Sequence, residues 1–142
     1  MNLRRIALAL CAITASAFAA DAPKITPVDA AKLVSEGKAV LVDCREPREW
    51  KSTGVAAPAV LLAKSDFDGD QKAWKEFLAS NSDKQVLIYC GSGGRSGTIA
   101  KALNEKGVKA ANVGGLKDWT AAGLPTRAVD AAKVEAKPAP KK

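Results

Sequence analysis

The sequence contains no histidine, and this absence narrows the chemistry open to its 142 residues. Serine–histidine and cysteine–histidine catalytic pairs are excluded, and so are metal sites built on imidazole. Aromatic residues are scarce too, at 5% of the chain. None of them lies among the basic residues of the C-terminal tail, so the base-stacking surface of a nucleic-acid-binding protein is not expected there. Any nucleophile in this chain must be activated without an imidazole base.

The first residues have the pattern of an export signal. Arg4 and Arg5 are basic, residues 6–18 are mostly apolar, and residues 17–19 form a small-residue cleavage site. The apolar run is too short for a stable membrane span. We therefore expect residues 1–19 to be a signal peptide, and the mature protein to lie in the bacterial periplasm without stable membrane insertion.

The other end of the chain is basic and poor in large apolar residues. Residues 127–142 consist mainly of alanine, lysine and proline, and they supply much of the formal net charge of +7. Such a segment cannot bury enough apolar surface to fold, so we expect a disordered, solvated tail. The export signal argues against a nucleic-acid partner, and we expect a monomer that binds small molecules and needs no metal or cofactor.

Between these ends, residues 22–126 alternate short apolar segments with amphipathic ones. This alternation predicts a single α/β domain with a central parallel sheet and helices on both faces. In such sheets the ligand site lies beyond the carboxyl ends of the strands. A short edge strand is expected at Ile25, and further strands at residues 39–44, 59–62, 85–90 and 110–113. Helices are expected from Pro27 to Gly37 with Thr26 as the N-cap, after a cap at Asp70, at 98–106 and at 117–121.

The strand at residues 85–90 ends in a cysteine and leads directly into a glycine-rich loop. Cys90 is followed by Gly91, Ser92, Gly93, Gly94, Arg95 and Ser96. A sulfur placed where the first amides of a helix converge is stabilised as a thiolate. Alternatively, Cys90 is a buried structural cysteine beside a tight turn. The positive charge of Arg95 and the following helix favour sulfur chemistry.

The spacing of this loop resembles that of the rhodanese family of sulfurtransferases. Its Cys-x-x-Gly-x-Arg pattern has four residues between Cys90 and Arg95, whereas the related cradles of tyrosine and dual-specificity phosphatases have five. The resemblance extends over most of the predicted domain, through residues 41–47 with Glu49 and Trp50, residues 114–116, Trp119 and residues 123–125. Residues 54–59 depart from the family pattern, because its usual histidine is missing.

The resemblance implies a function and a set of site residues. Cys90 would carry a transferred sulfur as a persulfide, taken from a donor such as thiosulfate and passed to cyanide or a thiol. Arg95 would position the loop and substrate, while the loop residues 91–94 and Ser96, with Asp43 and Arg45 from the neighbouring strand, would bind the substrate. For Asp43 and Arg45 a purely structural role is an equal alternative, and Arg45 and Glu49 can form an ion pair.

Two other functions remain open on the sequence alone. The chain can be a binding or sulfur-carrier module that keeps the fold without turnover, although the intact Cys90 and Arg95 argue against it. It can also be a cysteine-dependent phosphatase or arsenate reductase, which the short loop disfavours. A calcium loop at Asp66, Asp68 and Asp70 is disfavoured because Gly69 is misplaced and Phe77 occupies the last ligand position.

A second cysteine, Cys44, ends the predicted strand at residues 39–44. If that strand neighbours the one ending at Cys90, the two sulfurs lie at the same edge of the sheet. One interpretation is a small buried apolar residue. The other is a resolving thiol that forms a disulfide with an oxidised or persulfidated Cys90.

Overall fold

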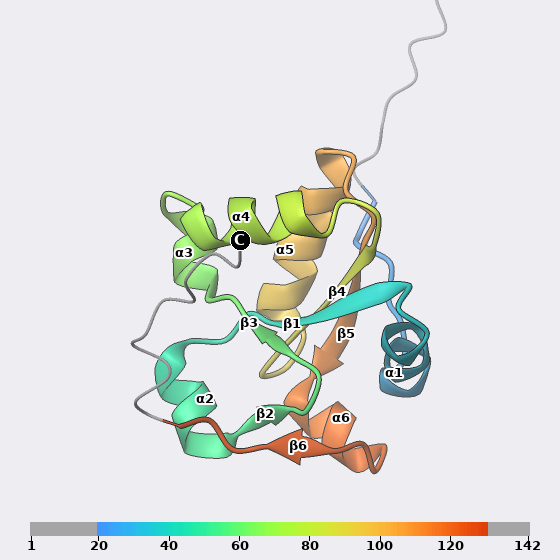
Figure 1. Cartoon of the computed structure of the whole chain (residues 1–142), viewed down its shortest axis with the longest axis vertical. Helices are drawn as coiled ribbons and strands as arrows, with labels where there is room; N and C mark the ends of the chain where they lie inside the picture. Colours follow the sequence, from blue (N-terminus) through green and yellow to red (C-terminus); the bar gives the residue numbers. More distant parts are fainter. Residues whose placement is uncertain (1–19, 131–142) are drawn as a thin grey trace, which may run out of the picture.

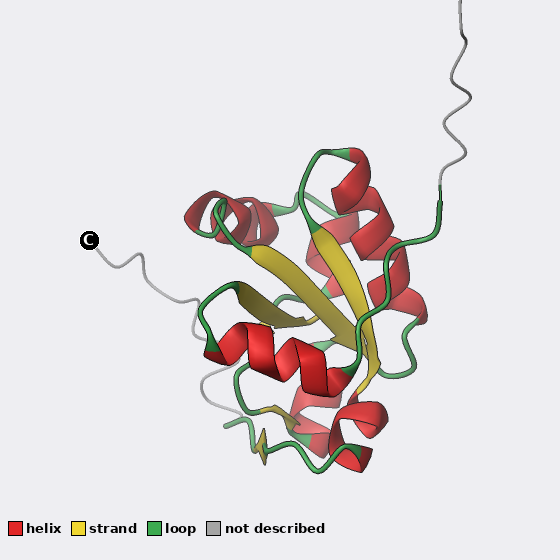
Figure 2. Ribbon diagram, turned by 90° about the vertical axis from the view of Figure 1, so that its right-hand side faces the viewer, coloured by secondary structure: helices red, strands yellow, loops and turns green. Residues whose placement is uncertain are grey.

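The computed structural model describes residues 20–130 of the chain. Four parallel strands form the central sheet in the order β3-β1-β4-β5, as Figures 1 and 2 show. The interior strands β1 and β4 pair in register, so that Asp43 lies beside Tyr89. The strands are β1 (Ala39–Asp43), β3 (Val60–Leu61), β4 (Gln85–Cys90) and β5 (Ala110–Gly115).

Helices cover both faces of this sheet, which confirms the predicted α/β architecture. Buried residues of α1 (Pro27–Ser35) and α6 (Leu116–Ala121) pack on one face, around Tyr89. Buried residues of α4 (Lys72–Ser80) and α5 (Gly94–Glu105) pack on the other, around Ile88 and both cysteines. Because both faces are covered, β4 has no polar alternation after Gln85, and residues 86–90 are all buried.

The two edges of the sheet are both blunted. On one side β3 contributes only two residues. On the other, the segment before α1 covers β5: the Ile25 N–H donates to the Asn112 carbonyl at 3.0 Å, and the Asn112 N–H donates to the Pro23 carbonyl at 2.8 Å. The short edge strand predicted at Ile25 is thus a single bridge, centred on Lys24 and Asn112.

A second, two-stranded sheet corrects the predicted domain boundary. β2 (Val55–Ala56) pairs antiparallel with β6 (Thr126–Arg127). Arg127 also donates to the carbonyl oxygens of Ala57 and Ala59, at 3.1 and 2.9 Å. Arg127 therefore belongs to the fold, and the predicted tail begins too early; residues 131–142 lie outside the described residues, as do residues 1–19.

The helices after β3 and β4 differ from prediction at their N-termini. A short helix that the sequence analysis did not predict, α3 (Lys64–Asp68), precedes α4. Asp66 of α3 accepts hydrogen bonds from the N–H groups of Ala73 and Trp74, whereas the predicted cap, Asp70, accepts one from Lys72. Helix α5 begins at Gly94 rather than at residue 98, because the glycine-rich stretch is itself helical.

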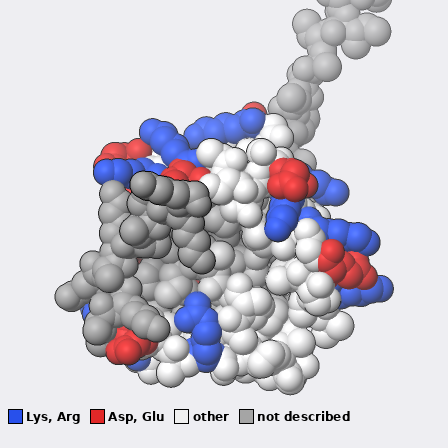
Figure 3. All heavy atoms as spheres, viewed as in Figure 1, with Lys and Arg blue, Asp and Glu red and all other residues white. Residues whose placement is uncertain are grey.

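The surface carries charges of both signs. On the face shown in Figure 3, basic and acidic side chains lie close together along the upper and right-hand rims, beside an uncharged area. Within residues 20–130, none of the helices has the length and apolar character needed to cross a membrane.

Candidate active site

Cys90 is the last residue of β4 and lies shortly before the start of α5. Only 1% of its surface is exposed. Gly93 adopts a positive φ of 94°, which turns the chain sharply into the helix and suits a residue without a Cβ atom. The turn directs the Gly93 N–H to the Cys90 Sγ at 3.1 Å, and the Ser96 Oγ lies 3.4 Å from the same sulfur. The predicted cradle around the sulfur is therefore present.

These donors hold the pKa of Cys90 far below that of an ordinary thiol. The largest contribution is a hydrogen bond from the Cys44 thiol; the Ser96 hydroxyl and the backbone N–H groups of Ser96 and Ser92 add to it. Burial acts in the opposite direction, because it penalises the charged form. Since the donors outweigh burial, the thiolate form of Cys90 is favoured without a general base.

Cys44 has the opposite electrostatic character. It is completely buried, and its pKa is raised well above the ordinary range, first because it donates its proton to Cys90 and then because of burial. Cys44 therefore remains a neutral thiol in the resting protein.

Asn112 fixes the back of the loop, and the sequence analysis missed it. Its Nδ2 donates to the Gly93 carbonyl at 2.9 Å, and its Oδ1 lies 2.7 Å from the Ser96 Oγ and accepts from the Gly114 N–H at 3.0 Å. The one hydroxyl hydrogen of Ser96 thus has two acceptors within reach, Asn112 and Cys90. Asparagine is uncommon in strands, so Asn112 within the predicted strand at residues 110–113 was the signal in the sequence that could have indicated this role.

Arg95 forms a bidentate ion pair with Glu49 of α2 (Pro47–Thr53), with N–O distances of 2.7 and 2.8 Å. Both side chains are about one-third exposed. The pair lowers the pKa of Glu49 to about 2, because the carboxylate accepts charge-assisted hydrogen bonds from Arg95. Arg95 thereby joins the active-site loop to α2, and the predicted pairing of Glu49 with Arg45 is wrong.

Asp43 and Arg45 form a second ion pair at the end of β1, and it is buried. Both carboxylate oxygens of Asp43 accept from the Arg45 guanidinium, at distances between 2.7 and 3.1 Å. Arg45 also donates to the Thr53 hydroxyl and the Gly54 carbonyl, at 2.8 and 2.7 Å. This network anchors α2 to the sheet, so the structural role that the sequence left open for both residues is present.

The turn between β5 and α6 lies directly against the active-site loop. A Cβ atom on Gly115 would stand 2.3 Å from the Gly91 carbonyl oxygen, so a side chain there would displace the loop. Asp118 holds the turn by accepting from the Gly115 N–H at 2.8 Å. Val55, at the position where the family pattern has its histidine, is completely buried in β2.

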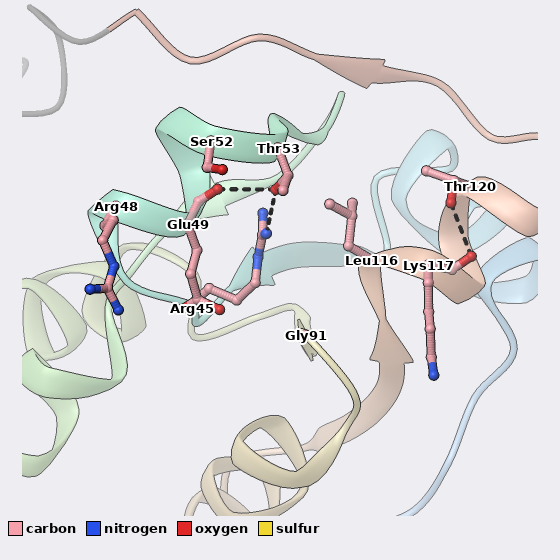
Figure 4. A pocket seen from close by; sticks show the side chains of 9 residues that line it. All are labelled: Arg45, Arg48, Glu49, Ser52, Thr53, Gly91, Leu116, Lys117 and Thr120. Carbon is pink, nitrogen blue, oxygen red and sulfur yellow. Dashed lines mark hydrogen bonds between the residues drawn. The ribbon is translucent and has the colours of Figure 1, made fainter.

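A pocket of about 550 Å³ opens beside the loop. Gly91 forms part of its wall, and Figure 4 shows Arg48 and Lys117 on opposite sides of Gly91. The rest of its lining comes from Leu116 and from Arg45, Glu49, Ser52, Thr53 and Thr120. Two cationic side chains near the Cys90 loop suit an anionic reactant. Among residues 20–130 no cluster of carboxylates and cysteines is suited to a metal ion; Asp66 caps α4 and Asp68 pairs with Lys64.

Taken together, the structure is a parallel α/β sheet with a buried cysteine, Cys90, at its carboxyl edge, beside a glycine-rich loop and a pocket. The family model for the rhodanese-like domain matches residues 26–122, and the chain belongs to this family. This result confirms the resemblance seen in the sequence.

Individual relatives agree with the assignment. The chain is 30% identical over 89 residues to YtwF of Bacillus subtilis, named as a candidate sulfurtransferase, covering 62% of this chain and 80% of the relative. It is similar to the polysulfide-sulfur transferase homodimer of Wolinella succinogenes, with 26% identity, coverage of 77% and 80%, and a TM-score of 0.61. A Rhodopseudomonas palustris protein of unknown function, suggested to be a tyrosine phosphatase, gives 28% identity, coverage of 75% and 85%, and a TM-score of 0.62. Family membership and the Bacillus relative support a transferase of the sulfurtransferase type.

Proposed function

We propose that this protein moves a sulfane sulfur from an anionic donor such as thiosulfate to a thiol or cyanide, through a persulfide on Cys90. One observation carries the proposal: the Cys90 sulfur accepts from backbone, hydroxyl and thiol donors together, in a chain without histidine. A nucleophile that is already a thiolate needs no base, and sulfur transfer between thiolates and sulfane sulfurs moves no proton.

The reaction would have two displacement steps. The Cys90 thiolate attacks the outer sulfur of thiosulfate, a sulfur–sulfur bond forms, and sulfite departs with the electron pair of the bond that breaks. An acceptor thiolate or cyanide then attacks the terminal sulfur, and the Cys90 thiolate leaves. The N–H groups at the start of α5 face negative charge in both steps, and such fixed donors need no reorganisation during the reaction.

The charged residues around the loop would serve the donor. Arg48 and Lys117 flank the pocket beside Gly91 and can attract a dianion. Arg95 shares its charge with Glu49, so it would act mainly by holding the loop open toward this pocket. Asp43 and Arg45 would act indirectly, by fixing α2, which forms one side of the pocket.

The loop length is the argument against a phosphatase, although one structural relative was suggested to be one. Four residues separate Cys90 from Arg95, and α5 begins within that stretch, so fewer amides encircle the sulfur than a tetrahedral phosphate needs. We also propose export to the bacterial periplasm, a monomeric state and no nucleic-acid partner. These proposals rest on the sequence of residues 1–19 and on composition.

The proposal is tested with purified mature protein and three substrates: thiosulfate, mercaptopyruvate and a phosphate ester. We expect thiocyanate from thiosulfate and cyanide, and essentially none from Cys90→Ser, whose hydroxyl is not ionised at neutral pH. Intact-protein mass spectrometry immediately after mixing with thiosulfate should show one added sulfur that Cys90→Ser lacks. Equal sulfur addition to both proteins, or hydrolysis of the phosphate ester alone, would contradict the proposal.

A further inference from the structure

Cys44 and Cys90 lie side by side in the centre of the molecule. β1 and β4 pair in register up to Asp43 and Tyr89, and the Cys44 N–H extends the ladder by donating to the Tyr89 carbonyl at 3.0 Å. Both cysteines belong to the same buried cluster, together with Val42 and Ile88, so their side chains project from the same face of the sheet. Neighbouring strands stand roughly 4.8 Å apart, within the Cα separation of about 4.4–6.8 Å that a disulfide spans.

The two thiols also influence each other. Cys90 raises the pKa of Cys44 and Cys44 lowers the pKa of Cys90, each first through a side-chain hydrogen bond, and both cysteines are free thiols. Cys44 has no exposed surface, and its other neighbours in the cluster are apolar. A thiol in that position is shielded from solvent reagents, so Cys90 is the sulfur that it can reach.

We propose that Cys44 is a resolving thiol, which attacks the Cys90 sulfur of the persulfide, forms a Cys44–Cys90 disulfide and expels hydrosulfide. This step rests on the proposed function, which supplies the persulfide. The bond between the two cysteine sulfurs forms as the bond between Cys90 Sγ and the sulfane sulfur breaks. The electron pair of the broken bond and the Cys44 proton leave with the sulfane sulfur, so the two thiol sulfurs are oxidised and the sulfane sulfur is reduced.

The arrangement also explains why Cys44 does not interfere with the resting protein. While Cys90 is a thiolate, Cys44 is held as its proton donor. Once Cys90 carries the sulfane sulfur, the negative charge lies on that terminal sulfur. Cys44 then faces Cys90 Sγ as an electrophilic sulfur. An external acceptor attacks the terminal sulfur, whereas Cys44 attacks the inner one.

The consequence is an activity beyond transfer to an external acceptor. With a dithiol to reduce the Cys44–Cys90 disulfide, each cycle would convert thiosulfate and two thiol groups into sulfite, hydrogen sulfide and a disulfide. The dithiol supplies both electrons, and the atoms balance without any other reactant.

The test is a single turnover without acceptor. Reduced, anaerobic wild type, Cys44→Ala and Cys44→Ser are mixed with thiosulfate, and the protein mass, the released hydrosulfide and the non-reduced peptides are followed over time. Cys44→Ser is the matched control, because serine keeps a hydrogen-bond donor beside Cys90 but cannot form a disulfide. We expect both variants to keep the added sulfur, and wild type to lose it at least about tenfold faster, since an adjacent group reacts at a high effective concentration.

Separate outcomes bear on the two proposals. Loss of sulfur from wild type, with one equivalent of hydrosulfide and a Cys44–Cys90 linked peptide, supports the resolving step. A persulfide equally stable in all three proteins overturns that step and leaves the proposed function intact, whereas no added sulfur on any protein overturns both.

A second arm avoids sulfur transfer altogether. One equivalent of hydrogen peroxide should oxidise the Cys90 thiolate to a sulfenic acid, which condenses with the Cys44 thiol to a disulfide and water. The same linked peptide is expected in wild type and not in Cys44→Ser. Its absence from wild type would overturn the pairing itself.

Discussion

Two neighbouring strands of the sheet each have a cysteine at the carboxyl end, Cys44 directly after β1 and Cys90 as the last residue of β4, and an arginine follows each cysteine in sequence. The two ends behave differently. At the end of β1, Arg45 follows Cys44 directly and turns back onto Asp43 inside the protein. At the end of β4, four residues separate Cys90 from Arg95, and that arginine reaches the surface to meet Glu49. The loop after β4 supplies backbone N–H donors to the Cys90 sulfur. No such loop lies between Cys44 and Arg45, which are adjacent in sequence.

The difference shows that the donors around a thiol decide its state, while the residue type is the same. Cys90 accepts hydrogen bonds and is a thiolate, whereas Cys44 donates one and is a neutral thiol. The arginines follow the same logic. The buried Arg45 has its charge matched by Asp43 and holds helix α2, whereas Arg95, about one-third exposed, joins the active-site loop to α2 through Glu49.

The largest expected effect is a difference in the free energy of unfolding between variants of the Asp43–Arg45 pair and of the Glu49–Arg95 pair. Asp43→Asn leaves the Arg45 charge buried without a carboxylate, so we expect a loss of about 3–5 kcal/mol in the free energy of unfolding. Glu49→Gln is the matched change at the rim, where a pair that water screens contributes about 0.2–1 kcal/mol. Urea unfolding of both variants measures the difference. Equal losses would show that burial does not distinguish the two pairs.

Next in size is the effect of Arg95 on transfer. Removing its charge-assisted contacts in Arg95→Ala should cost on the order of 1.5–3 kcal/mol in kcat/KM for thiosulfate, with little change in unfolding. It should also raise the pH at which Cys90 is alkylated, because a nearby positive charge favours the thiolate. Unchanged thiosulfate kinetics together with an unchanged alkylation profile would leave Arg95 with a purely structural role.

The smallest expected effect isolates one donor to the thiolate. Ser96→Ala removes a hydroxyl that favours the charged form, so the pKa of Cys90 should rise by roughly one unit, equivalent to about 1.4 kcal/mol. Ser92→Ala is the control, because the donor from residue 92 is its backbone N–H. The rate of alkylation by iodoacetamide against pH measures both; a larger rise in Ser92→Ala would assign the contribution to the wrong side chain.

The features of the fold that depend on a local sequence pattern could be predicted from the sequence. The apolar runs of β1 and β4, the N-cap at Thr26 and the turn after Cys90 follow from periodicity and residue type, and the structure confirms them. Family resemblance added the nucleophile and the role of its loop, which remain predictions about chemistry. The location of the site followed from the rule that ligands bind beyond the ends of parallel strands.

Contacts between distant residues could not be predicted in this way. Glu49 and Arg95 are 46 positions apart, and nothing in either neighbourhood selects this pair over Arg45 and Glu49. Asn112 reaches back to Gly93 only because β5 lies beside β4. Arg127 was assigned to the tail by composition, yet its strand pairing with Val55 is a tertiary contact.

The blunted edges of the sheet have a consequence for how the protein behaves at high concentration. An open strand edge offers unpaired N–H and carbonyl groups to other chains, and it is a common starting point for aggregation. Here one edge strand has two residues, and the other is covered by hydrogen bonds from residues 23–25. The strands whose carboxyl ends position the two cysteines, β1 and β4, are interior. The backbone that places the reactive sulfur is therefore kept away from intermolecular strand pairing, and colloidal stability and the integrity of the site depend on the same arrangement.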